Sequence, residues 1–337
     1  MIGPRLDEPE LIALLRGRFL RRGRGLELGI GDDAAVIRFG GERLLLAKDL
    51  LVEGVDFRRA WQPPRFLGRK SLNVNLSDIA AMGGRPLYAL LGLALPKNLE
   101  GPWVEDVLRG FGEAAEEHGV LLVGGDLSRA DRVMISVTIA GRAEKPVLRT
   151  GAKPGDFLFV SGTLGDAAGG LRLLKRKNET ILKDADGAPA GKSRRPGIRL
   201  VEAFLDPQPR VALGLELARR GLASAMIDLS DGLSVDLGHL CRESRVGAEV
   251  WASSLPLSSE LRMLFPAPLN LALHGGEDFE LLFSARPAGV KELLRLSRRH
   301  PLYPVGRVVR GEEIILIGCR GRRSRLPERG WRHFSSR

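Results

Sequence analysis

Six aspartates are the residues of this chain best suited to do chemistry. Each lies close to a glycine or a serine, or at the predicted end of an apolar strand: Asp33, Asp49, Asp78, Asp126, Asp228 and Asp231. Carboxylate oxygens are ligands that Mg²⁺ prefers in proteins, and nearby glycines let backbone N–H groups approach a phosphate. We therefore expect these acids to converge around divalent cations and phosphate groups.

Asp78 is expected to stand at the centre of this cluster because of the segment that carries it. The run from Asn73 to Met82 is almost wholly apolar or small, and Gly83-Gly84 follows it as a typical helix stop. A carboxylate is rarely buried in such a helix without a partner. The other acids are predicted to reach Asp78 on turns and strand ends.

Each acid taken singly also has an ordinary structural explanation. Asp beside Gly is common in turns, and Asp ahead of a helix is a common cap. The set of six, with apolar strands leading into it, favours a shared site instead. The sequence has no Walker A pattern, kinase glycine loop or Rossmann fingerprint. His274 is a weak candidate for a base, because its place in a glycine-rich turn favours a structural role.

Composition narrows the class of protein. At 337 residues with 44% hydrophobic residues, the chain is expected to form two domains with substantial cores. Cys241 and Cys319 are far apart and lack neighbouring ligand-type residues, which argues against a disulfide framework or a zinc site and fits a reducing cytoplasm. No apolar run approaches the roughly 20 residues that span a bilayer, and no secretory signal core is recognisable, so no membrane association is expected.

The net charge of +11 raises the question of nucleic-acid binding. The arginines responsible are scattered along the chain, and aromatic residues are not interleaved with them as stacking platforms. A solvated basic surface is the preferred interpretation, and a nucleic-acid partner is not expected.

The elements that must position the acids are helices and short strands in irregular alternation, which predicts a mixed α/β and α+β fold. In the first half we predict helices at 7–22, 73–82 and 103–118, strands at 26–30, 36–39, 43–47 and 133–140, and buried strands at 87–95 and 120–123. In the second half we predict strands at 157–161, 225–229, 279–283, 305–309 and 313–317, helices at 171–177, 211–219, 233–243 and 290–298, and a loop at 183–196. A turn-rich junction at 150–156 suggests domains at 1–146 and 147–337.

Seven motifs occur in an order that resembles the thiamine-monophosphate kinases, a family within the aminoimidazole ribonucleotide synthetase-like superfamily. The resemblance runs from about residue 24 to 334, and its motifs span residues 29–33, 49–57, 73–84, 124–126, 149–156, 227–233 and 274–278. It implies a homodimer in which the N-terminal domain sheets pair across the dimer, with a site between the two domains of each chain. It also implies direct in-line transfer of a phosphoryl group from ATP to thiamine monophosphate, assisted by several Mg²⁺ ions.

The resemblance also assigns roles to residues that match its motifs. Metal ligands would be Asp33, Asp49, Asp78, Asp126, Asp228 and Asp231. Contacts to ATP would come from Gly125, Asp126, Arg149 and Ser230. Thiamine monophosphate would be bound by Asp56, Glu277 and Trp331, with the indole stacking on a substrate ring. No dedicated catalytic base is expected, because the attacking atom is already a phosphate oxygen.

One departure from the family pattern concerns Ala47-Lys48, which stand where the family usually has a pair of hydroxyl residues before Asp49. The Lys48 ammonium could replace part of the cation charge near the phosphates, or it could point to solvent. The departure leaves open another phosphate-activating enzyme of the superfamily with a different acceptor. A non-catalytic nucleotide-binding protein is a third alternative, although it would predict lost acids, and the acids are intact.

Overall fold

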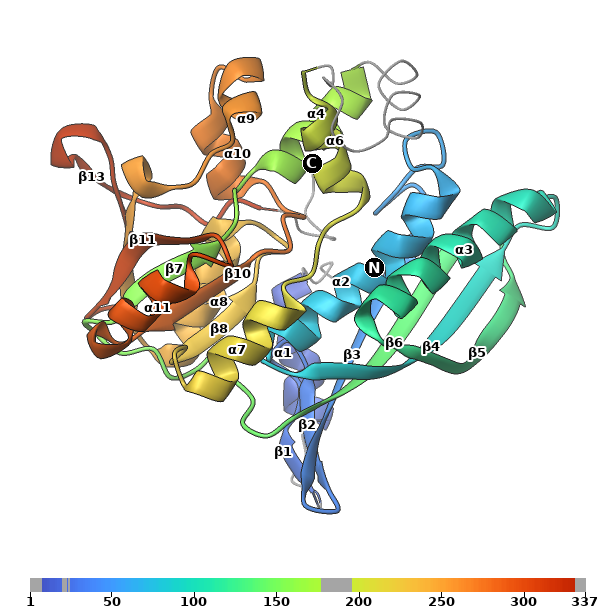
Figure 1. Cartoon of the computed structure of the whole chain (residues 1–337), viewed down its shortest axis with the longest axis horizontal. Helices are drawn as coiled ribbons and strands as arrows, with labels where there is room; N and C mark the ends of the chain where they lie inside the picture. Colours follow the sequence, from blue (N-terminus) through green and yellow to red (C-terminus); the bar gives the residue numbers. More distant parts are fainter. Residues whose placement is uncertain (1–7, 20–22, 24, 177–195, 331–337) are drawn as a thin grey trace, which may run out of the picture.

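The computed structural model describes residues 8–19, 23, 25–176 and 196–330 (Figure 1). These residues form a six-stranded and a seven-stranded sheet with helices packed against both, which confirms the predicted mixed α/β and α+β class. None of the described helices is long and apolar enough to cross a membrane.

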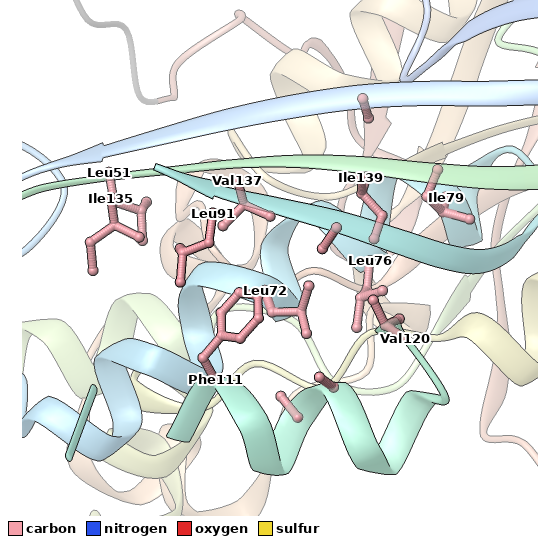
Figure 2. Close-up of a cluster of buried hydrophobic side chains, with 14 of the residues drawn as sticks. Leu51, Leu72, Leu76, Ile79, Leu91, Phe111, Val120, Ile135, Val137 and Ile139 are labelled. Carbon is pink, nitrogen blue, oxygen red and sulfur yellow. The ribbon is translucent and has the colours of Figure 1, made fainter. Parts of the chain in front are cut away.

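The first sheet is built from the N-terminal half and has the strand order β1-β2-β3-β6-β4-β5. Its strands are β1 (Leu26–Leu28), β2 (Ala35–Phe39), β3 (Glu42–Val52), β4 (Arg85–Leu95), β5 (Leu121–Arg129) and β6 (Met134–Ala143). Helices α2 (Pro64–Ala81) and α3 (Gly101–His118) lie on one face of it. Leu72 and Leu76 of α2 and Phe111 of α3 pack against Leu91 and Val137 of the sheet (Figure 2).

Helix α2 begins earlier than predicted, because Pro64 is well suited to the first turn of a helix. It ends where the sequence predicts, with Gly83 at φ 64° and the Gly84 N–H bonded to the Ile79 carbonyl at 2.9 Å. Its contact with α3 is unusually close: a Cβ on Gly68 would lie 1.9 Å from the Val107 carbonyl oxygen. The two helices are therefore held at a fixed separation under the sheet.

The other face of the first sheet is open. Every residue of β5 is exposed, and on this face Leu121 of β5 is 63% exposed and Leu90 of β4 is 46% exposed. The prediction of a buried strand at 120–123 is therefore wrong, and that at 87–95 holds for one face only. The reason is that β5 is an edge strand and no described helix covers that face, which local apolarity cannot reveal.

The second sheet comes from the C-terminal half and has the order β13-β12-β9-β11-β7-β10-β8. Its strands are β7 (Phe157–Ser161), β8 (Ala225–Asp228), β9 (Gly247–Trp251), β10 (Leu281–Ala285), β11 (Leu302–Val309), β12 (Ile314–Ile317) and β13 (Arg323–Arg325). Helices α8 (Leu233–Ser244) and α10 (Pro268–His274) share a core with one face, and α7 (Val211–Arg220) and α11 (Val290–Leu296) with the other. The central strands are consequently buried on both sides.

Several elements differ from their predicted form. Helix α4 (Asp166–Arg176) begins earlier than predicted, within the small-residue run. The elements α6 (Ile198–Leu205), α9 (Ser259–Leu264), α10 and β9 were not predicted. These elements are short, and a short segment contains too few residues for its hydrophobic periodicity to predict a helix or a strand. Most of the predicted loop at 183–196 lies outside the described residues. Helix α1 (Glu8–Phe19) forms, but much of its apolar face is exposed.

Helix α2 connects the two halves of the chain (Figure 1). Ala80 and Ala81, near its C-terminal end, belong to the core that α7 and α11 form with the second sheet. The contact with α7 is backbone to backbone, since a Cβ on Gly214 would lie 2.1 Å from the Ala80 carbonyl oxygen. Residues of α2 are thereby fixed relative to both sheets.

Candidate metal and phosphate site

Three of the six predicted acids meet at the junction of the two halves. One carboxylate oxygen from each of Asp33, Asp78 and Asp228 lies within 4.8 Å of the other two. Asp33 follows β1, Asp78 sits in the last turn of α2, and Asp228 ends β8. The helix from the first half thus meets a strand end of the second.

The crowding of these carboxyl groups perturbs their ionisation. Burial, followed by the Asp33 charge, raises the pKa of Asp228 to about 8. Burial and the Asp49 charge raise the pKa of Asp78 well above its usual range. One oxygen of Asp33, Oδ2, is buried and has no hydrogen-bond partner among the described residues. An all-oxygen donor set with an unpaired buried oxygen fits a hard divalent cation such as Mg²⁺.

Arg149 brings positive charge to the same place. Its Nη2 donates to Asp33 Oδ1 at 2.7 Å, and its backbone N–H donates to Asp32 Oδ2 at 3.1 Å. Burial and the neighbouring Asp33 raise the pKa of Asp32 to about 7. Asp32 was not among the predicted site residues, although its place beside Asp33 in the glycine-containing turn could have indicated it.

Two polar residues of α2 orient the acids and were also missed. Ser77 donates its hydroxyl to Asp228 Oδ2 at 2.7 Å. The Asn75 side-chain carbonyl accepts the Asp49 backbone N–H at 3.0 Å. The signal was available, since polar side chains in an otherwise apolar helix need partners when they are buried.

Asp49 lies within β3 and not at its end, because the strand continues to Val52. Strand alternation puts Asp49 on the same face as the buried Ala47 and Leu51, toward α2. Burial and the charge of Asp56 raise the pKa of Asp49 to about 6. Asp56 is held by the backbone N–H of Val52, 2.8 Å from its Oδ2.

Gly125 and Asp126 are not at a strand end either, because β5 runs through them to Arg129. A Cβ on Gly125 would lie 1.9 Å from the Leu91 carbonyl oxygen, so glycine is needed for this strand pairing. Asp126 is exposed on the edge strand and is not in the three-carboxylate group found among the described residues.

The turn of Ser230 and Asp231 is held by a further acid that the sequence did not indicate. Asp236 is buried and accepts the Gly232 and Asp231 backbone N–H groups at 2.9 and 3.2 Å. The carbonyl of Ser230 in turn accepts the N–H of Glu277 at 2.8 Å. Asp231 follows Asp228 closely but does not belong to the three-carboxylate group.

Glu277 occupies a strained backbone position. Its φ is 70°, which a residue with a side chain rarely adopts. Trp331 lies outside the described residues, but Gly330 packs so tightly on the Asp231 turn that a Cβ there would lie 2.4 Å from the Asp231 carbonyl oxygen. His274 is explained structurally, since its Nδ1 lies 2.9 Å from Ser234 Oγ and 3.0 Å from the Arg329 carbonyl oxygen.

Lys48 is exposed and lies on the open face of the first sheet, opposite to Asp49. Its ammonium bonds the Ser136 hydroxyl on the neighbouring strand β6. This arrangement supports the interpretation that Lys48 points away from the acids. It does not support the interpretation that Lys48 replaces a cation.

Two family models match the chain. They are described as AIR synthase related protein, N-terminal domain, over residues 31–143, and AIR synthase related protein, C-terminal domain, over residues 153–318. Among curated proteins, the thiamine-monophosphate kinase of Aquifex aeolicus is 36% identical over 309 residues, covering 90% of this chain and 92% of that protein. The thiamine-monophosphate kinase of Bacillus subtilis is 36% identical over 280 residues, covering 82% of each.

Solved structures agree with these relatives. A structure described as AaThiL complexed with AMPPCP and TMP has a TM-score of 0.85 and 34% identity, and the match covers 99% of this chain and 100% of that one. The thiamine-monophosphate kinase from Stenotrophomonas maltophilia has a TM-score of 0.76 and 38% identity, with 93% and 96% covered. HypE in a HypE-HypF complex, at 17% identity and a TM-score of 0.70, shares the fold alone.

Proposed function

The chain belongs to the thiamine-monophosphate kinase family, and on that premise we propose that it transfers the γ-phosphoryl group of ATP to the phosphate of thiamine monophosphate. The products are thiamine diphosphate and ADP. The observation that carries the proposal is the meeting of Asp33, Asp78 and Asp228 at the junction of the two halves. This donor set suits the metal ions that accompany ATP.

Mg²⁺ is the proposed metal. Asp33, Asp78 and Asp228 would hold it directly, and Asp49, Asp126 and Asp231 are the further candidate ligands. When bound, the metal supplies neutralisation of the phosphate charge and alignment of the reacting oxygens. The unpaired Oδ2 of Asp33 and the raised pKa of Asp228 support a cation at this place.

The residues of the chain contribute mainly by positioning. No strong base is required, because the acceptor oxygen belongs to a phosphate that is already ionised at neutral pH, and catalysis then depends on alignment and charge. Ser77 and Asn75 hold Asp228 and the Asp49 segment in place from α2. Arg149 is proposed to contact ATP while its guanidinium orients Asp33.

The proposed ATP contacts also include Gly125, Asp126 and Ser230. The proposed contacts to thiamine monophosphate come from Asp56, Glu277 and Trp331. Two features support the latter set. Asp56 is close enough to Asp49 for its charge to raise the pKa of Asp49, and only burial raises that pKa more. Glu277 is bonded through its backbone to Ser230.

We also propose that the protein is a cytoplasmic homodimer in which the open faces of the first sheets pair. The support is the set of exposed apolar side chains on that face, Leu50, Leu90 and Leu121 among them, since large exposed apolar patches mark interaction sites. The proposed domains are residues 1–146 and 147–337, each containing one of the two sheets.

The test is a coupled assay of ADP release with ATP and Mg²⁺, with and without thiamine monophosphate, in which the product is identified as thiamine diphosphate. Strong stimulation by thiamine monophosphate that a chelator abolishes is the expected result. ATP binding without stimulation would instead indicate an enzyme of the same superfamily with another acceptor. Absence of ATP binding would indicate that the site is not a kinase site.

A further inference from the structure

Lys70 is a buried charge that none of the proposed roles uses. It lies in α2, and the whole residue is only 1% exposed. Its ammonium donates to the Phe204 carbonyl at 3.1 Å and to Glu277 Oε2 at 2.9 Å. It also sits 3.9 Å from the centre of the Phe204 ring. Burying an ammonium is costly without such partners, so the site is built to hold a charged lysine.

The acid partner differs from Lys70 in its access to solvent. The Glu277 side chain is 30% exposed, whereas that of Lys70 is 1% exposed. A ligand could therefore reach the carboxylate of Glu277 but not the ammonium of Lys70. Any effect of Lys70 on a ligand must pass through Glu277.

The position of Lys70 on α2 relates it to the acid cluster. Ser77 follows Lys70 by seven positions, so the two side chains lie on nearly the same face of the helix. Ser77 bonds Asp228, and Lys70 bonds Glu277. One helix of the first half thus holds two acids of the second half. Asp228 belongs to the metal site, and Glu277 is held nearer the N-terminal end of α2.

Glu277 needs an external restraint. Glu277 at φ 70° and Phe279 at φ 48° are both in the left-handed region, which side chains disfavour. Such a conformation persists only where the surroundings impose it. The backbone bond to Ser230 restrains the main chain, and the ion pair with Lys70 restrains the side chain.

We propose that Lys70 is a positioning residue that fixes the Glu277 carboxylate for the phosphate acceptor, and that it thereby controls acceptor affinity without touching the acceptor. The inference rests on the proposed function, in which Glu277 binds thiamine monophosphate. It assigns the ammonium a role in recognition in addition to joining the two halves.

The chain offers a matched control for the purely structural alternative. Arg69, the neighbouring residue, also joins α2 to the second half through an ion pair, with its Nε 2.9 Å from Asp206 Oδ2. That pair does not involve Glu277. A purely structural role for Lys70 predicts the same pattern of effects for both residues.

The experiment compares Lys70→Met with Arg69→Met in steady-state kinetics and thermal unfolding. We expect Lys70→Met to raise the KM for thiamine monophosphate by about 10- to 100-fold, as loss of an outer partner of a ligand-binding group does. The KM for ATP should stay within about twofold of the wild-type value. Arg69→Met should lower Tm and leave both KM values unchanged. Lys70→Gln, which retains a hydrogen-bond donor, serves if Lys70→Met does not fold.

A double-variant cycle with Glu277→Gln completes the test. If Lys70 acts through Glu277, the double variant should have nearly the same acceptor KM as Glu277→Gln alone. Additive effects, or a Lys70→Met enzyme with a wild-type acceptor KM, would overturn the inference. A wild-type protein that thiamine monophosphate does not stimulate would overturn the proposed function itself, so the two failures are distinguishable.

Discussion

At the scale of single residues, the site is defined by like charges brought close together. Asp33, Asp78 and Asp228 share one small volume, and the guanidinium of Arg149 bonds Asp33 of these three. Such a cluster is destabilising unless protons or metal ions compensate it. Both the activity and the pH dependence of stability should therefore report on the metal.

Replacing Asp78 by Asn should abolish turnover while leaving the fold intact. An amide cannot supply an anionic oxygen to a cation, but its similar shape and lack of charge relieve repulsion with Asp33 and Asp228. The Tm of the metal-free variant should consequently equal or exceed that of the wild type. Asp106→Asn, on the exposed side of α3, is the matched control and should retain full activity. Near-normal turnover of Asp78→Asn would contradict the metal role.

Stability without metal should fall as the pH rises from about 4 to about 8. The pKa of Asp228 is raised from 3.8 to about 8 and that of Asp49 to about 6, so the folded state binds more protons than the unfolded chain in this range. Each such group contributes a slope of up to about 1.4 kcal/mol per pH unit. Saturating Mg²⁺ should remove the slope, since the cation replaces the protons. Thermal unfolding across this pH range, with chelator and with Mg²⁺, measures the two slopes. Identical pH profiles under the two conditions would argue against a cation at the cluster.

At the scale of elements, α2 is the part of the fold on which the site depends. It supplies Asp78, Asn75, Ser77 and Lys70, and its packing fixes how these side chains meet the second half. On its other side it rests on α3 through glycines that permit backbone contact. The position of α2 is thus set by small residues far from the chemistry.

A pair of glycines in α3 tests this packing. A Cβ on Gly110 would lie 1.8 Å from the Arg65 carbonyl oxygen, whereas a Cβ on Gly112 would meet nothing within 4 Å. Gly110→Ala should destabilise the protein by about 2 kcal/mol or more, because backbone must move. Gly112→Ala should stabilise it by up to about 1 kcal/mol through helix propensity. Chemical denaturation compares the two, and equal effects would show that α2 and α3 tolerate separation.

At the scale of the whole molecule, the open face of the first sheet has no counterpart in the second sheet, whose central strands are covered on both sides. The face carries Leu50, Leu90 and Leu121, which are all substantially exposed. Edge strands of this kind invite pairing with another chain. The proposed dimer would bury this surface and would place Asp126 of β5 within the interface region.

Leu90→Asp should convert the dimer into monomers. A charge in the centre of an apolar interface costs far more when buried than when solvated, and the fold of one chain does not depend on this exposed side chain. Light scattering coupled to size-exclusion chromatography gives the mass. Met263→Asp, an exposed apolar position in the second half, is the control and should remain dimeric. A monomeric wild-type protein would contradict the dimer directly.

The sequence by itself determined the local features and the family. The glycine stop after α2, the acid within its last turn and the ordered motifs follow from neighbours along the chain, and these were predicted. The apolar pattern also indicated the mixed class of the fold. Local propensity and periodicity suffice for such features because they depend on contacts within a few residues.

Only the tertiary structure decided which of the acids meet and what supports them. Asp33, Asp78 and Asp228 come together because α2 packs against both sheets, whereas Asp126 lies on an exposed edge strand. The burial of Lys70 against Glu277 and the exposure of β5 likewise depend on how distant segments pack. No pattern in a single sequence encodes these contacts, since their energy arises from surfaces that become neighbours only after the chain has folded.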